Sequence, residues 1–210
     1  MKCPNCQSKS FYQLANNYIK CKKCTKKISL KKREKDILIV EKFCENKNAL
    51  QTANELDLHY KTVKDRFDFL RKNIAIFLED IYHSSIKDYT EYEEYYYLKN
   101  SEKKRKKKSL NNSINIIGFY SNQRVYTLLM PSVRNSGLEE DGFMQYMIWY
   151  RLRSKNAHQT NLQIFWKYLD NNLRKYKGIN KENFFYYIKE YEFKFNYTKS
   201  EQLAILNSIV

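Results

Sequence analysis

Two pairs of cysteines constrain the fold of this chain more than any other feature of its sequence. Cys3 and Cys6 form one Cys-x-x-Cys pair, Cys21 and Cys24 form a second, and 14 residues separate the pairs. Four thiolates at this spacing can hold one Zn²⁺ ion tetrahedrally between two hairpins. Disulfide bonds are the alternative, but the sequence shows no secretion signal, and disulfides are rare in intracellular proteins. We therefore expect a structural zinc ribbon over residues 1–30.

The rest of this segment is typical of a small module that depends on its metal. Residues 10–14 and 17–20 favour short strands, and the segment is too small to fold on an apolar core alone. Its lysines can contact phosphates; they are Lys20, Lys22, Lys23, Lys26 and Lys27. The fifth cysteine, Cys44, has no partner at ligand spacing, so we expect a buried thiol there.

Residues 31–82 are typical of a helical DNA-binding domain. Asn48 can cap a helix that carries the small Ala53, and a turn over residues 57–59 precedes a further helix from Tyr60. The inner face of that helix would consist of Val63, Phe67 and Leu70. This pattern predicts a helix-turn-helix. Its outer face would offer four residues to DNA, namely Lys61, Thr62, Lys64 and Arg66. A plain helical bundle with a solvated basic face is the alternative.

The net charge indicates a polyanionic partner. Residues 1–80 (18 basic, 10 acidic) and residues 81–210 (21 basic, 13 acidic) each carry a net charge of +8. Such a field attracts nucleic acid more than an acidic small molecule. An AT-rich coding sequence would produce the same surplus of lysine, so that interpretation stays open. No apolar run is long enough to cross a membrane, and we expect a cytoplasmic, nucleoid-associated protein.

Three segments in the second half of the chain favour β-strands. They are residues 90–98, 113–119 and 124–130, and they predict an antiparallel meander. The first two segments are joined by a basic loop that includes Lys106 and Lys107. This loop is too charged to pack, so we expect it to be solvated and to contact the DNA backbone. A nuclear localisation signal is a further interpretation of such a run, but nothing else in the sequence supports it.

The last quarter of the chain favours two helices. Apolar residues recur at steps of three and four from about Thr160 to Tyr176, which is the period of one buried helix face. Gly178 stands where a left-handed C-cap residue belongs. Asn180 can cap a second helix. That helix would carry Phe184, Phe185, Tyr187, Ile188 and Tyr191.

Several phrases of the sequence resemble the small insertion-sequence transposases that carry a zinc ribbon and a DDE-type, RNase H-like catalytic domain. In that family a phrase like His-x-Asn-x-Ile-Glu-x-Phe-Trp is followed by a basic helix, Lys/Arg-x-x-Gly-Ile and a Glu-x-Glu-Phe-Arg-Phe-Asn-like ending. The matching residues are His158, Phe165, Trp166, Gly178, Ile179, Glu190, Glu192, Phe193, Phe195 and Asn196, while Thr160 stands where the family has Asn. The resemblance covers most of the chain and thins between residues 131 and 156.

The resemblance implies an α+β protein with an RNase H-like domain, shortened relative to the family, over residues 88–210. It implies three catalytic residues: Glu93 in place of the family's Asp, Asp141, and Gln163 in place of the family's Glu. These residues would hold Mg²⁺ or Mn²⁺ for the phosphoryl transfer that cuts and joins DNA strands. The implied partners are double-stranded DNA with the inverted repeats of the element, and further copies of the chain in a homo-oligomer.

The departures from the acidic triad leave other functions open. Glu93 could be a surface strand residue, Asp141 a turn or helix-start residue and Gln163 a solvent-facing helix residue. A catalytically inactive relative that binds DNA and a zinc-ribbon adaptor for a protein partner are therefore alternatives to an active transposase. His59 and His158 can ligate metal in principle, but a single histidine is more often a hydrogen-bonded structural residue.

Overall fold

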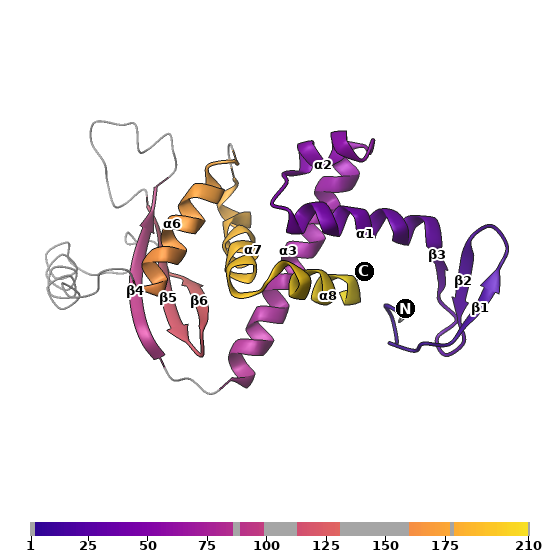
Figure 1. Ribbon diagram of the computed structural model, residues 1–210, viewed down its shortest axis with the longest axis horizontal. Helices are drawn as coiled ribbons and strands as arrows, with labels where there is room; N and C mark the ends of the chain where they lie inside the picture. Colours follow the sequence, from indigo (N-terminus) through magenta and orange to yellow (C-terminus); the bar gives the residue numbers. More distant parts are fainter. Residues whose placement is uncertain (1–2, 86–88, 99–112, 131–159, 177–178, 210) are drawn as a thin grey trace, which may run out of the picture. The chain divides into compact units, whose positions relative to one another are not determined.

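The computed structural model describes residues 3–85, 89–98, 113–130, 160–176 and 179–209 (Figure 1). Over these residues the chain is an α+β protein with six α-helices and two three-stranded antiparallel sheets, which confirms the expected class. The residues fall into two compact units. Unit 1 comprises Met1–Phe77 and Tyr197–Val210, and unit 2 comprises Leu78–Asn196. No helix in the described ranges has both the length and the apolar character that crossing a membrane requires.

Unit 1 begins with a small antiparallel sheet in the order β1-β2-β3. Its strands are β1 (Phe11–Leu14), β2 (Tyr18–Cys21) and β3 (Lys27–Ser29). Between β1 and β2, Asn16 and Asn17 take φ values of 60° and 59°. Asn adopts this left-handed conformation more readily than most residues, so the pair suits a tight reversal. The strands expected over residues 10–14 and 17–20 are confirmed.

The helices of unit 1 begin and end at local signals in the sequence. They are α1 (Leu30–Cys44), α2 (Ala49–Glu55), the first part of α3 (Tyr60–Ser84), and α8 (Lys199–Ile209). α1 ends before Asn46, whose φ of 59° is the left-handed conformation of a C′ residue. α2 begins with a capping box, because Asn48 and Gln51 each accept a hydrogen bond from the other's backbone N–H. The predicted cap at Asn48 is therefore confirmed.

Helices α1, α2 and α3 share an apolar core within unit 1. The rings of Phe43 and Phe67 meet edge to face with their centroids 4.9 Å apart. The predicted inner face of α3 is buried at Val63, Phe67 and Leu70, and Cys44 is a buried thiol as expected. Each large apolar side chain that is fully buried contributes about 1.5–3 kcal/mol to the free energy of unfolding. Because this face of α3 packs in the core, the opposite face of the helix is the one exposed to solvent.

Unit 2 contains the second sheet, in the order β4-β5-β6, and two further α-helices. Its elements are β4 (Tyr89–Tyr97), β5 (Ile114–Ser121), β6 (Arg124–Leu129), α6 (Asn161–Leu173), the short 3₁₀ helix η4 (Lys181–Asn183) and α7 (Phe184–Asn196). The predicted antiparallel meander and both C-terminal helices are confirmed. α6 begins at Thr160, whose hydroxyl accepts from the backbone N–H of Gln163 at 3.2 Å.

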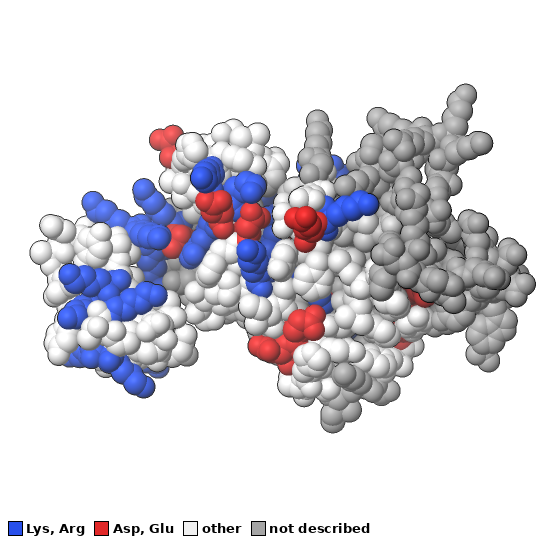
Figure 2. All heavy atoms as spheres, turned by 180° about the vertical axis from the view of Figure 1, so that it is seen from behind, with Lys and Arg blue, Asp and Glu red and all other residues white. Residues whose placement is uncertain are grey.

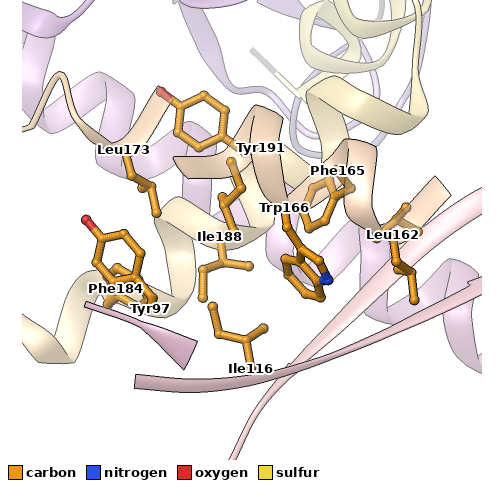
Figure 3. Packing of buried hydrophobic residues seen from close by; sticks show 11 residues of the cluster. Tyr97, Ile116, Leu162, Phe165, Trp166, Leu173, Phe184, Ile188 and Tyr191 are labelled. Carbon is orange, nitrogen blue, oxygen red and sulfur yellow. The ribbon is translucent and has the colours of Figure 1, made fainter. Parts of the chain in front are cut away.

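An apolar cluster joins α6 and α7 to one face of this sheet (Figure 3). The Trp166 ring stacks on Tyr95 of β4, with centroids 4.8 Å apart and planes 7° from parallel. The indole also lies on β5 at Gly118, where a Cβ atom would be only 2.5 Å from the ring. Glycine is therefore required at this position for α6 to approach the sheet so closely.

Side chains of α7 complete the hydrogen bonding of the outer edge of β6. Asn196 accepts from the backbone N–H of Val125 at 2.8 Å and donates to its carbonyl at 2.6 Å. Glu192 accepts from the N–H of Thr127, and Lys189 donates to the Thr127 carbonyl, each at 2.9 Å. These polar groups of α7 therefore take the place of a neighbouring strand and satisfy an edge that would otherwise be unpaired.

The last turns of α3 belong to unit 2 and pack on the same strand. Tyr82 stacks on Tyr126 with ring centroids 3.6 Å apart, and the Tyr126 hydroxyl donates to Glu79 at 2.7 Å. Lys189 lies 3.5 Å from the same carboxylate. One continuous helix thus contributes residues to both units.

Candidate metal centre and nucleic-acid surfaces

The four cysteines of the two pairs come together in unit 1. Their sulfur atoms all lie within 4.8 Å of one another, and the Sγ atoms of Cys3 and Cys24, like those of Cys6 and Cys21, are 3.5 Å apart. A disulfide would require about 2.05 Å. Four sulfurs arranged tetrahedrally about 2.3 Å from a zinc ion lie about 3.8 Å from one another. The cluster can therefore hold a metal ion such as zinc, and its cysteines are not paired in disulfides.

Both cysteine pairs lie in the same kind of backbone turn. Gln7 and Thr25 each follow the second cysteine of a pair, with φ values of 58° and 57°. Each donates its N–H to the carbonyl of the first cysteine of the pair, at 2.9 Å to Cys3 and 3.1 Å to Cys21. Non-glycine residues adopt this conformation at a cost of about 1–2 kcal/mol, which the surrounding structure must offset. Each of the two turns directs two thiols toward the same point, so the four thiols come together.

Hydrogen bonds favour the thiolate form in the second pair. The Asn5 side chain and the backbone of Lys26 lower the pKa of Cys24 to about 6. Backbone hydrogen bonds from Cys24 and Lys23 also lower the pKa of Cys21. The thiolate is the form that binds metal, so these contacts favour metal binding at the second pair. In the first pair a backbone hydrogen bond from Ser8 lowers the pKa of Cys6, but desolvation and hydrogen bonds with the other three thiols outweigh it and raise that pKa.

The first turn of α3 places three of the predicted DNA-contacting residues in solvent. Lys61, Thr62 and Lys64 are all exposed. Lys64 lies 3.2 Å from Asp68 one turn along, which raises the pKa of the lysine. An exposed i,i+4 pair of this kind holds its ammonium group only weakly. His59 has a structural role just before the helix, because its Nδ1 accepts from the backbone N–H of Lys61 at 3.2 Å.

Arg66, the fourth predicted DNA-contacting residue, already has partners within unit 1. Its guanidinium lies 3.1 Å from Asp36 of α1 and 4.7 Å from the centre of the Phe69 ring. Both members of the ion pair are more than four-fifths buried. Such a pair costs more to break than an exposed one, because each charge would lose its partner in a poorly solvated place. Arg66 therefore holds α3 against α1.

Glu93, the first predicted catalytic residue, is half-buried on β4 and faces α6. Its Oε2 accepts a hydrogen bond from the indole Nε1 of Trp166 at 3.1 Å. Desolvation raises the pKa of Glu93; the Trp166 donor lowers it and the nearby Glu91 carboxylate raises it again. A carboxyl group in this setting gains its charge less readily than one in water.

Glu91 has a role that the sequence did not reveal. Its Oε1 accepts from the backbone and side-chain nitrogens of Asn161 at 3.2 and 2.8 Å, and its Oε2 accepts from the N–H of Leu162 at 3.0 Å. The carboxylate thus caps the N-terminus of α6, where backbone N–H groups lack partners and the helix dipole favours a negative charge. Its partner lies 70 residues away in sequence, beyond the reach of any local capping pattern.

The remaining predicted site residues do not complete an acidic metal site in the part of the chain that is described. Gln163 is exposed in the first turn of α6. Asp141, Lys106, Lys107 and His158 lie outside the described residues. Within the described ranges, the cysteine cluster is the only group of three or more His, Cys, Asp or Glu side chains close enough to hold a metal ion. The described carboxylates therefore do not form the Mg²⁺ or Mn²⁺ site that the resemblance implies.

No protein-family model, curated protein or solved structure matches the chain. The features of the described residues that bear on function are the cysteine cluster, the exposed start of α3 and the surroundings of Glu93.

Proposed function

We propose that the chain is a DNA-binding transposase of the small insertion-sequence type, which recognises double-stranded inverted repeats and acts as a homo-oligomer. The observation that carries the proposal is the start of α3. There Lys61, Thr62 and Lys64 are exposed, while Val63 and Phe67 on the opposite face are buried in the core of unit 1. A helix that is anchored on one face and presents cations on the other is suited to the major groove.

The geometry around α2 supports a helix-turn-helix. α2 closes where Leu58 donates its N–H to the carbonyl of Ala53 at 2.9 Å, with Asp57 at a φ of 50°. The chain then turns into α3 within a few residues. In this arrangement Thr62 would meet a base edge, and Lys61 and Lys64 would contact phosphates. Arg66 would keep α3 in place through Asp36 and would not contact DNA directly.

The four-cysteine cluster supports a zinc ribbon with a structural role. Zinc fits its donors, because four thiolates are a common ligand set for a closed structural site. The ion, when bound, would supply folding energy to the strands β1–β3 and would leave no open position for a substrate.

The proposal that the chain cuts and joins DNA strands depends on unit 2. It is favoured by the position of Glu93 on the first strand of an antiparallel meander, where the resemblance expects the first catalytic acid. The hydrogen bond from Trp166 to Glu93 and the neutral, exposed Gln163 favour the alternative, a DNA-binding relative without catalysis.

The test measures binding and cleavage separately. Fluorescence anisotropy at several salt concentrations measures binding of the full chain to a duplex that contains the flanking inverted repeats. The Lys61→Ala, Lys64→Ala double variant should bind this duplex much more weakly than the wild type. The slope of log affinity against log salt should fall by about 2, since each lost phosphate contact reduces it by about 0.9. Lys181→Ala, an exposed lysine of unit 2, serves as the matched control.

Two outcomes would decide between the candidates. Metal-dependent cleavage and strand transfer that disappear in Glu93→Ala would establish the enzyme. Repeat-specific binding without product would establish the DNA-binding relative. An unchanged duplex affinity and salt slope in the double lysine variant would contradict the helix-turn-helix assignment itself.

A further inference from the structure

The sheet β1-β2-β3 carries an exposed face that duplex recognition by α3 does not use. The register pairs Tyr12 with Lys20 and Lys20 with Lys27, so these three residues lie in one row across the three strands. Tyr18 precedes Lys20 by two residues and therefore shares its face. We call this surface, made of Tyr12, Tyr18, Lys20, Lys22 and Lys27, the tyrosine–lysine face.

The two tyrosines of this face are open to solvent. Tyr12 is 56% and Tyr18 44% exposed, although an aromatic ring in a folded module is usually covered. Ile19, which stands between Tyr18 and Lys20, points to the other side of the sheet and is buried. The side that carries the tyrosines therefore presents flat aromatic surface to water.

The charge around these rings has a single sign. Residues 3–33 contain nine Lys and Arg residues and no Asp or Glu. Figure 2 shows Lys and Arg atoms spread over the end of the chain that holds this sheet. Lys22 Nζ lies 4.9 Å from the centre of the Tyr12 ring, so a cation accompanies the aromatic surface directly. A polyanion with flat, stackable groups has both the charge and the shape that this face complements.

We infer that the tyrosine–lysine face binds an unpaired strand of DNA. Two bases would stack on Tyr12 and Tyr18, and the flanking phosphates would lie against Lys20, Lys22 and Lys27. Rings on a sheet combined with cations are the means by which proteins bind single strands without reading sequence, since every base has a π-face. A duplex offers these rings nothing to stack on, because its base faces are already covered by neighbouring base pairs.

This inference goes beyond the proposed function and does not require it. Duplex recognition by α3 and capture of an unpaired strand by the N-terminal sheet use different residues of unit 1. They can therefore be tested with different probes and different variants, and one can fail while the other holds.

The experiment measures binding of the zinc-loaded full chain to a fluorescein-labelled oligothymidylate of about 12 nucleotides, within the range of sites that such surfaces cover. The Tyr12→Ala, Tyr18→Ala double variant should bind at least about 25-fold more weakly, taking the low end of about fivefold per stacked base. Its salt slope should stay unchanged. The triple variant Lys20→Ala, Lys22→Ala, Lys27→Ala should instead lower the slope by about 2, at about 0.7 for each phosphate contact of a single strand.

Four controls separate stacking from damage to the module. Tyr12→Phe with Tyr18→Phe keeps both rings and should retain the affinity. Gln13→Ala alters a residue between the two tyrosines that lies on the other side of the sheet, and it should have no effect. Bound zinc, measured as one equivalent per chain in every variant, shows that the sheet has formed, and duplex affinity at α3 provides an independent check.

Three results would overturn the inference. One is an affinity for oligothymidylate that the double alanine variant leaves unchanged. Another is a blunt duplex of the same length that competes for this face as well as the single strand does. The third is an oligouridylate of equal length that binds more tightly than the DNA strand, which would make RNA the ligand.

Discussion

At the scale of single residues, two glutamates only two positions apart on β4 have opposite electrostatic surroundings. Glu91 accepts three hydrogen bonds at the N-terminus of α6. Glu93 accepts one hydrogen bond from an indole, while desolvation and the nearby Glu91 carboxylate disfavour its charged form. Sequence alone identified Glu93 as the residue of interest through its place in a family phrase. It could not show that the neighbouring Glu91 is a helix cap, because α6 is brought to it only by the tertiary fold.

The raised pKa of Glu93 predicts how stability depends on pH. Between the unfolded value, near 4.5, and the higher folded pKa, the folded chain holds more protons than the unfolded chain, so the free energy of unfolding falls as pH rises. Glu93→Gln cannot titrate. Urea unfolding from pH 4 to 8 should therefore show the wild type losing stability relative to this variant across that window, with no further divergence above it.

A second variant tests whether the surroundings of Glu93 cause this dependence of stability on pH. Trp166→Phe removes the donor that lowers the pKa of Glu93, so the loss of stability should extend to higher pH even though the shortened ring also lowers stability overall. Wild-type and Glu93→Gln curves that stay parallel over the whole range would show that this carboxyl group is not perturbed in the folded chain.

At the scale of elements, the sequence predicted best those segments whose signals are local. The apolar period of α6 and its cap at Thr160, the capping box at Asn48 and the three strands of unit 2 all follow from neighbouring residues. α8 was not predicted, although Thr198 and Glu201 form a capping box that marks its start. Its apolar period is weak, and the capping residues alone do not predict how far the helix runs.

The continuation of α3 to Ser84 follows the apolar period of its start, since Ile74 and Leu78 are buried at further steps of four. The polar side chains of α7, by contrast, are an example of what local patterns do not show. Lys189, Glu192 and Asn196 appear as charged and polar residues of a helix, and only the fold shows that they bind the edge of β6.

The edge contacts of α7 predict a specific cost at Asn196. Asn196→Ala should lower the free energy of unfolding by about 1–3 kcal/mol, because the buried N–H of Val125 loses its acceptor. Asn171→Ala on the exposed side of α6 is the matched control and should change stability little. Urea denaturation measures both variants, and equal stability of the two would mean that the edge of β6 does not depend on this side chain.

At the scale of the whole molecule, the chain draws its stability from two different sources. Unit 2 and the helices of unit 1 have apolar cores built from large side chains. In the described residues before α1, Ile19 is the only apolar side chain apart from the cysteines that is buried. That segment cannot offset the entropy of ordering its backbone without further free energy, and the four thiolates provide a site from which metal binding can supply it.

Zinc removal should therefore unfold one part of the chain and spare the rest. A strong chelator, or Cys21→Ser, should abolish the hydrogen-exchange protection of β1–β3, while protection in the cores of α1, α3 and α7 persists. Cys44→Ala is the matched control: this cysteine lies in the core of the helices and away from the cluster, so the variant should keep one zinc ion per chain.

Because the tyrosine–lysine face is built on β1–β3, chelation should abolish binding of the single strand and leave most of the duplex affinity of α3. Strands that stay protected without metal, or zinc lost equally from Cys44→Ala and Cys21→Ser, would show that the module is held together by something other than its four cysteines.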